Sequence, residues 1–366
     1  MNTFHAQLAQ TLLAAVRSQD FGLSADTWDG GAPVRHFPSI DLAVVAFKPG
    51  QPARWANVLF SREHPHGLAA AIAQDASALR QVRFDKDQTD AQKDSVVWAT
   101  RTQWSQLSWR SLHSQHDAGA VRFVAPYPAS LLKLMVAVGV GLAVDGGLCA
   151  WPDALDPMIT VSDNDATDTC VALLHRVGLL RASTAPGFNG HQPLNAHFAA
   201  HGLPTLQVND TTARGGWRNG DGSGVGHIHM TAWDSLRLLW LLDAAAPPAP
   251  WLTTAQRQAP LLKPATRDRL REVLSRQQLD EILSSGSLRR LPGWVRGGPD
   301  APAFAHKTGT TDNYAADAGI VSTPQAHYIV AVLTSLGQRY APCGDCATTW
   351  RMPALGRAVY DAVKAL

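Results

Sequence analysis

Ser130 and Lys133 have the residue types and the spacing for nucleophilic chemistry. Lys133 is the only polar side chain in the run LLKLMVAVGVGLAV, residues 131–144. Positions three apart lie on one face of a helix, so the hydroxyl and the amine should point the same way. An apolar setting disfavours the charged form of a lysine, and a neutral amine can take a proton from a neighbouring hydroxyl. The pair is therefore a candidate nucleophile and general base. A lysine that extends from the edge of a core helix to water is the structural alternative.

Two further tripeptides strengthen the chemical interpretation. Ser162-Asp163-Asn164 follows 32 residues after Ser130, and Lys307-Thr308-Gly309 lies near the C-terminus. Each tripeptide alone is also compatible with a polar turn or a helix cap. The order Ser-x-x-Lys, Ser-Asp-Asn, Lys-Thr-Gly is the combination found in class A β-lactamases and penicillin-binding proteins.

The chain thus resembles the superfamily of active-site serine hydrolases that contains these enzymes, on its class A side. The resemblance extends from Arg122 to Leu366. It includes RFVAPYPASLLKL before the first motif and the segment of residues 261–294 before Lys-Thr-Gly. It implies an α+β fold of the β-lactamase/transpeptidase type: an antiparallel sheet built from both termini, flanked by helices, with an inserted all-helical lobe.

The resemblance implies acyl transfer, with Ser130 as the nucleophile and Lys133 as the leading candidate for the general base. Ser130 is expected at a helix N-terminus, where a free backbone N–H and the helix dipole can supply half of an oxyanion hole. The resemblance implies that the backbone N–H of Thr310 is the other half.

The remaining site residues also come from the resemblance. Ser162 is expected to pass a proton to the leaving nitrogen, and Asn164 to bind the substrate amide and Lys133. Lys307 is expected to orient Ser162 and attract an anion, and Thr308 to bind a substrate carboxylate. Gly309 leaves room for a substrate along the strand edge. The expected partner is a small molecule or short peptide that carries a carboxylate.

Two features depart from class A enzymes. Those enzymes carry a loop Glu, after Ser-Asp-Asn, that activates the deacylating water, but no Glu occurs here between Ser162 and Glu272. Asp210 and Asp221 are available substitutes, although neither has the expected spacing. The interval from Ser130 to Ser162 is also short, so some helices over the site should be missing.

Three functional hypotheses follow. The first is a serine hydrolase of the class A β-lactamase type, acting on β-lactams or related amides and esters. The second is a D,D-peptidase or penicillin-binding-protein-like amidase on cell-wall peptides, which the missing Glu favours. The third is a binding or sensor domain that is acylated and never turns over.

Composition limits the other possibilities. The chain has 366 residues, 45% of them hydrophobic, and 32 basic against 30 acidic residues. This balance gives no reason to expect nucleic acid. We expect no cofactor and no metal, because His227 and His229 lack partners at ligand spacing. Cys149 and Cys170 should be buried thiols, and Cys343 with Cys346 should have a structural role, with a redox pair as the alternative.

The N-terminal segment predicts an amphipathic helix, because Phe4, Leu8, Leu12 and Val16 recur every four residues. It lacks the pattern of a secretory signal, and no run is long enough for a membrane span. As written, the chain is expected in the cytoplasm, or in the periplasm if a signal was removed.

The elements divide into two parts. Residues 1–120 are an N-terminal extension, with strands at 40–47 and 53–60, a helix at 66–82 and a strand at 95–109. Residues 121–366 are the hydrolase domain: a helical lobe to residue 300, then strands and a closing helix in 301–366. We expect the helix carrying Ser130 to start after Pro128 and end near Gly146, another helix to follow Ser-Asp-Asn, and a further helix to be capped at Thr231.

Overall fold

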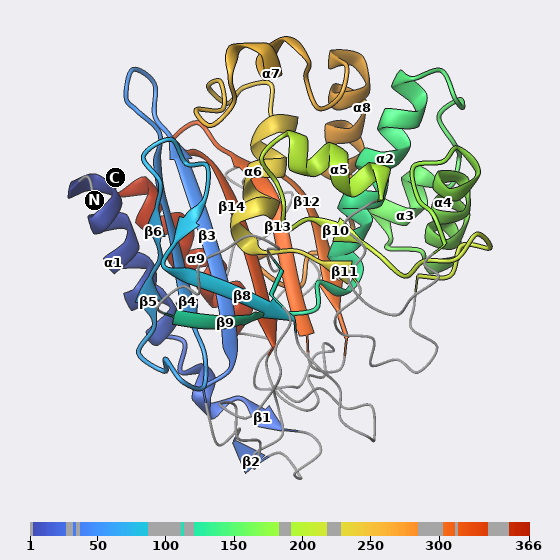
Figure 1. Ribbon diagram of the computed structural model, residues 1–366. Helices are drawn as coiled ribbons and strands as arrows, with labels where there is room; N and C mark the ends of the chain where they lie inside the picture. The colour runs from blue at the N-terminus through green and yellow to red at the C-terminus, as the bar shows by residue number, and fades with distance from the viewer. Residues whose placement is uncertain are drawn as a thin grey trace.

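A central sheet connects the two ends of the chain. The computed structural model describes residues 3–26, 32–33, 37–86, 111–112, 121–182, 192–217, 228–284, 303–311, 314–335 and 351–366. Six strands form the sheet in the order β12-β13-β14-β3-β4-β5, with every neighbouring pair antiparallel. Their bounds are β3 Ser39–Phe47, β4 Arg54–Phe60, β5 Leu68–Ala69, β12 Ala303–Thr310, β13 Tyr314–Ser322 and β14 His327–Ser335. Because strands from both ends of the sequence pair directly, the predicted sheet is confirmed (Figure 1).

Helices cover both faces of this sheet. On one face, α1 (Thr3–Arg17) packs against β4 and against α9 (Arg351–Lys364), with the two chain ends close to each other (Figure 1). The other face carries the helical lobe, in which α6 contacts β3, β13 and β14. The lobe helices are α2 Lys133–Asp145, α3 Leu155–Thr160, α4 Asn164–Arg176, α5 Pro193–Ala200, α6 Ala232–Leu242, α7 Thr254–Gln258 and α8 Pro264–Ser275.

The pattern of burial explains this layering. Every residue of β3 except Phe47 is buried, as expected for a strand covered on both faces. Its alternate side chains enter two different cores: Ala43 and Val45 face the helical lobe, whereas Leu42 and Val44 face α1 and α9. The strand therefore holds the two halves of the molecule together.

Several predicted helix boundaries are confirmed. A short 3₁₀ turn, η4 (Ala129–Leu132), follows Pro128 and leads into α2, whose C-cap is Gly146. Thr231 caps α6 by accepting a hydrogen bond from the Asp234 N–H. The helices expected at the N-terminus, after Ser-Asp-Asn and at the C-terminus are present as α1, α4 and α9.

The helix predicted at residues 66–82 is wrong. This segment contains the short strands β5, β6 (Ala71–Ile72) and β7 (Leu79–Arg80). Three residues interrupt any helix, because Gly67, Ala76 and Gln81 have φ values of 73°, 60° and 60°. Its alanines suggested a helix, but the turns at these residues fold the segment into a hairpin over the sheet edge.

Short two-stranded pairs complete the description. They are β1 (Ala25–Asp26) with β2 (Ala32–Pro33), β6 with β7, β8 (Val82–Lys86) with β9 (Val121–Ala125), and β10 (Gln207–Val208) with β11 (Ile228–His229), besides the short turn η1 (Phe21–Leu23). The β8–β9 pair is parallel and leads the chain to the turn at Ser130. No helix among the described residues is long and apolar enough to cross a membrane. The strand predicted at 95–109, Cys343 and Cys346 lie outside the described residues, and the division at residue 120 stays a prediction.

Candidate functional site

Ser130 lies in a tight turn between β9 and α2. The turn begins with Ala129 in the left-handed region, at a φ of 48°, and continues as η4. The Ser130 side chain is half-buried, and α2 after it is buried on nearly all sides. A helix surrounded by core gives the residues at its N-terminal end a fixed position. The sequence thus places the predicted nucleophile at the start of a rigid element.

Lys133 is fully buried and has three acceptors within reach. Its Nζ donates to the backbone oxygen of Ser162 at 2.6 Å, to Ser162 Oγ at 3.1 Å and to Asn164 Oδ1 at 2.8 Å. Three acceptors match the three N–H groups of an ammonium. Within the described part of the chain, the Ser130 hydroxyl makes no hydrogen bond. In this structure Lys133 therefore contacts the Ser-Asp-Asn motif. One of these three hydrogen bonds must break before Lys133 Nζ can take a proton from Ser130.

The Ser-Asp-Asn motif forms a strained turn between α3 and α4. Ser162 adopts a φ of 59°, which is uncommon for a residue with a Cβ. Asp163 caps α4, because its Oδ1 accepts the Ala166 N–H at 2.7 Å. The motif thus contains a helix cap as well as the two residues that contact Lys133. The cap fixes the start of α4 and so aims Ser162 and Asn164 at Lys133.

Lys307 approaches the same hydroxyl from the sheet. Its Nζ lies 3.0 Å from Ser162 Oγ and 2.8 Å from the backbone oxygen of Thr308, and its side chain is fully buried. Ser162 Oγ therefore sits between two amines from distant parts of the sequence. The structure brings all three motifs together around this one oxygen.

The two amines affect each other electrostatically. Burial lowers the pKa of Lys307 well below its usual value, and the nearby positive charge of Lys133 lowers it further. Asp317 and Glu281 oppose this change with their negative charges. The result is an amine that gives up a proton far more readily than a lysine in water, which suits a group that takes part in proton transfer.

Gly309 allows the Lys-Thr-Gly strand to touch the turn at Ser130. A Cβ at this position would lie 2.4 Å from the backbone oxygen of Pro128, 2.5 Å from the nitrogen of Leu131 and 2.9 Å from the nitrogen of Ser130. No side chain can occupy that space, so a residue without one is required. The close approach places the backbone N–H of Ser130 directly beside the outer edge of β12.

Among the described residues, that outer edge of β12 has no strand beside it, and its Thr308 C=O accepts the hydrogen bond from Lys307 Nζ. The Thr311 N–H bonds to the Tyr314 oxygen across the hairpin, so Gly309 and Lys307 direct their peptide groups toward β13. The peptide groups of Thr308 and Thr310 therefore point to the open edge, on the side of Ser130. The same alternation puts the Thr308 and Thr310 side chains on the opposite face of the sheet from Lys307. Binding of a carboxylate by the Thr308 hydroxyl stays a prediction.

A buried ionic cluster supports the strand from its other face. His306 lies between two carboxylates, with Nδ1 2.8 Å from Asp317 Oδ1 and Nε2 3.1 Å from Asp280 Oδ1. Burial alone would lower the pKa of His306, but the two carboxylates outweigh it and the pKa is raised. The Leu283 N–H also donates to Asp317. The cluster thus fixes the segment 280–284 against the strand that presents Lys307.

Trp217 is a site residue that sequence analysis missed. Its ring centroid lies 5.6 Å from Lys133 Nζ, and its side chain is buried. Gly215, with a φ of 99°, positions it, because a Cβ there would lie 2.1 Å from the backbone oxygen of Asp168. The signal in the sequence was the pair Gly215-Gly216 directly before a tryptophan. The indole covers one side of the amine in the loop where class A enzymes carry their Glu.

The structure describes one of the two aspartates considered as substitutes for the missing Glu. Asp210 lies in this same loop with a φ of 52°, and Asp221 lies outside the described residues, as does His227. The described segments contain no group of three His, Cys, Asp or Glu side chains arranged around a metal position. Cys149 and Cys170 are free thiols, half-buried and buried, and burial raises the pKa of Cys170 to about 12.

Comparisons with known proteins bear on the family and the fold of the chain. The model of the β-lactamase enzyme family matches residues 144–363, more than half of the chain, starting just after Ser130 and Lys133. No curated protein matches the chain in sequence.

Solved structures with the same fold cover nearly the whole chain. A mutant of PBP-A, as its acyl-enzyme complex with penicillin G, has a TM-score of 0.52 at 17% identity and covers 99% of this chain and 97% of its own. A β-lactamase from Sphaerobacter thermophilus has a TM-score of 0.52 at 15% identity, covering 98% of both chains. A class A representative from Bacteroides cellulosilyticus has a TM-score of 0.51 at 15% identity, covering 98% of this chain and 99% of its own. At these identities the likeness establishes the fold.

Proposed function

The chain belongs to the β-lactamase enzyme family, and from this premise we propose that it is an active-site serine hydrolase whose nucleophile is Ser130. The observation that carries the proposal is the convergence on Ser162 Oγ of two buried amines, Lys133 at 3.1 Å and Lys307 at 3.0 Å. The strand that presents Lys307 also touches the backbone of Ser130 through Gly309. A structural lysine at the edge of a core helix would not need a second buried amine on the same hydroxyl.

Acylation uses these groups in sequence. Once Lys133 has lost a proton and released one of its three acceptors, the Ser130 hydroxyl gives its proton to this amine, and the Ser130 oxygen attacks the carbonyl carbon of an amide. The C–N bond then breaks, and Ser162 passes its proton to the leaving nitrogen. Ser162 regains a proton from the amines on either side of it, so no proton has to come from solvent at that moment. The product is an ester between Ser130 and the acyl group.

Two backbone donors support the proposed transition state. In this proposal the N–H of Ser130 and the N–H of Thr310 both donate to the carbonyl oxygen of a bound substrate beside the edge of β12, where that oxygen gains negative charge. Removal of one such donor typically reduces a rate by about 10² to 10³-fold. The free edge also offers main-chain hydrogen bonds to an extended, peptide-like substrate. We therefore expect substrates with an amide or β-lactam carbonyl and a carboxylate near the two lysines.

A second candidate function is that of a penicillin-binding protein, in which the acyl-enzyme is slow to hydrolyse. Two observations favour it: no Glu occurs between Ser162 and Glu272, and Trp217 covers Lys133 in the loop where that Glu would lie. An indole cannot accept a proton from water. Deacylation is then expected to be the slow step, and the natural acyl donor is expected to be a D-amino-acid peptide.

A chromogenic cephalosporin with stopped-flow detection and intact-protein mass spectrometry tests both candidates. Steady hydrolysis supports a β-lactamase. One rapid equivalent of colour followed by a stable adduct on Ser130 supports the penicillin-binding type. Absence of both colour and adduct would refute the proposal for this substrate class.

The variants Ser130→Ala and Ser130→Cys sharpen this test. The first should form no adduct, whereas the second retains a nucleophile at the same position and should still be acylated at a reduced rate. Ser61→Ala is a matched control, because Ser61 is a buried serine just after β4, at the other edge of the sheet, and its Oγ accepts a hydrogen bond from the His64 N–H. Colour development in Ser130→Ala at the wild-type rate would exclude Ser130 as the nucleophile.

A further inference from the structure

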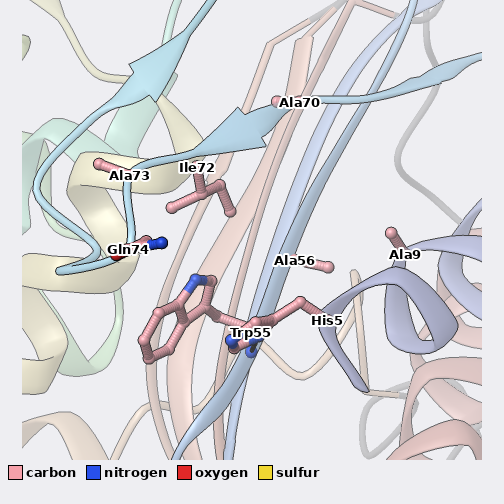
Figure 2. A pocket seen from close by; sticks show the side chains of 8 residues that line it. All are labelled: His5, Ala9, Trp55, Ala56, Ala70, Ile72, Ala73 and Gln74. Atoms are coloured by element: carbon pink, nitrogen blue, oxygen red, sulfur yellow. Dashed lines mark hydrogen bonds between the residues drawn. The ribbon is translucent and has the colours of Figure 1, made fainter. Parts of the chain in front are cut away.

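A cavity of about 370 Å³ lies at the opposite edge of the sheet from β12. Figure 2 shows the side chains that line it, which come from three elements. They are His5 and Ala9 of α1, Trp55 and Ala56 of β4, and Ala70, Ile72, Ala73 and Gln74 in and around β6. The strands β13, β14 and β3 separate this cavity from Ser130 and the two lysines, so it does not belong to the hydrolase site.

The cavity exists because the edge of the sheet splits. Strand β5 pairs with β4 only at Val58 and Leu59, and Ala70 adds one more bond to the oxygen of Asn57. Beyond that point the chain leaves β4, and β6 pairs with β7 instead. In the described residues, the outer edge of β4 at Trp55 therefore has no strand beside it, and the cavity occupies the opening.

His5 takes the place of the missing strand for one peptide group. The Trp55 N–H donates to His5 Nδ1 at 3.1 Å, and the two rings stack with centroids 4.4 Å apart. Because Nδ1 accepts, a neutral His5 carries its proton on Nε2 and remains a donor there. Burial lowers the pKa of His5, which favours this neutral form. In an antiparallel strand the Trp55 C=O points to the same edge as its N–H, so the opening also has a main-chain acceptor.

The walls are fixed before any ligand arrives. The hairpin above the cavity is tied to α6 by two hydrogen bonds, from Trp233 Nε1 to the Ala76 oxygen at 3.3 Å and from an Arg237 nitrogen to the Ser77 oxygen at 2.6 Å. On the other side Ala9 is 2% exposed and belongs to the core between α1 and the sheet. These contacts hold the hairpin in place, so the opening does not close by a simple shift of the hairpin. Because the cavity is formed before binding, less conformational entropy is lost when a ligand enters it.

The lining residues determine which kind of ligand the cavity can hold. Half of the lining residues are alanines, which leave flat apolar walls, and Trp55 adds an aromatic surface. The polar groups are few: the His5 imidazole, the Gln74 amide, the Trp55 indole N–H and the Trp55 C=O. No lining residue is an acid, a lysine or an arginine. A mostly apolar cavity of this size with a few directed polar groups is typical of small-molecule sites, and no charged side chain lines it to pair with an ion.

We propose that this cavity is a second binding site, for a small, neutral, planar heteroaromatic compound that packs against the stacked His5–Trp55 ring pair and exchanges hydrogen bonds with His5, Gln74 and the edge of β4. This ligand differs in class from the carboxylate-bearing substrates proposed for Ser130, which need the two lysines. The site does not depend on the hydrolase proposal, because none of its residues contacts that machinery.

The probe is 5-fluoroindole, followed by ¹⁹F NMR line broadening on the full-length protein. We expect a Kd of about 1 mM or tighter for the neutral compound and binding at least about tenfold weaker for 5-fluoroindole-2-carboxylate, which adds a charge that nothing in the cavity neutralises. Failure of 5-fluoroindole to broaden at several millimolar would overturn the proposal, as would equal binding of the anion.

Two variants and one control locate the binding. Ala73→Leu fills the cavity, and His5→Ala removes the stacking ring and its donor at a half-buried position, so each should weaken binding at least about tenfold. Ala255→Leu makes the same substitution on the exposed face of α7 and should bind like the wild type. Undiminished affinity in His5→Ala would place the ligand elsewhere, even if Ala73→Leu did not fold. Acylation by penicillin should proceed unchanged in both cavity variants.

Discussion

The contact between Gly309 and the turn at Ser130 gives a sharp test of the proposed site. In Gly309→Ala, the new methyl group would lie 2.4 Å from the Pro128 oxygen and 2.5 Å from the Leu131 nitrogen, whereas ordinary contacts begin near 3.4 Å. The atoms in contact are backbone, so they cannot rotate away. Strand β12 and η4 must separate by about 1 Å, the difference between these distances.

This displacement changes the positions of Lys307 and the Thr310 N–H relative to Ser130. A misplacement of about 1 Å in a catalytic arrangement can reduce a rate by about 100-fold. We therefore expect the rate of Ser130 acylation by a chromogenic cephalosporin, measured by stopped flow, to fall by about 100-fold. The affinity for substrate should change less, because the variant retains the side chains of Lys133, Ser162 and Lys307.

The matched control is Gly22→Ala, since a Cβ at Gly22 meets nothing within 4 Å. Circular dichroism should show that both variants are folded at the assay temperature. An acylation rate in Gly309→Ala within about threefold of the wild type would refute the reasoning, because the strand and the turn would then not need their close approach.

Three further predictions concern stability. Burial raises the pKa of Asp41 from 3.8 to about 6. The free energy of unfolding should therefore fall by up to about 3 kcal/mol as the pH rises from about 4 to 6. Urea titrations of Asp41→Asn should not show this fall. Asp317 and Asp280 raise the pKa of His306 despite its burial. The contribution of protonated His306 to the free energy of unfolding should therefore be complete below pH about 6.5 and be lost as the pH rises above it. A decline of equal size in His306→Asn would contradict this assignment. Leu174→Ala should cost about 2–5 kcal/mol in urea unfolding because the side chain is fully buried, and a loss below about 1 kcal/mol would show that the lobe repacks.

Much of the site could be predicted because its motifs are local. Ser130 and Lys133 are one turn apart, and Asp163 caps the helix that follows it, so their relative positions depend on nearby backbone only. The order of the three motifs then indicated a known kind of fold. Segments with strong apolar patterns, such as residues 40–47, were also assigned correctly for this reason.

Other features depend on contacts between distant segments. The predicted helix at 66–82 failed because alanine-rich sequence has a helix preference, whereas three residues with positive φ and the edge of β4 impose a hairpin. Trp217 was missed because its position over Lys133 depends on a loop that packs against α4.

The amino-acid sequence by itself determined which groups could do chemistry and that a sheet would form from both ends of the chain. The resemblance implied that Asn164 would bind Lys133 and that Lys307 would orient Ser162, whereas the tertiary structure alone decided that both amines converge on the one Ser162 hydroxyl. The reason is physical: residue types and short spacings fix local geometry, whereas the meeting of residues 133, 162 and 307 requires the packing of a helix, a turn and a strand into one core. The opening beside Trp55 depends on the tertiary structure in the same way, because no local sequence pattern shows where β5 stops pairing with β4.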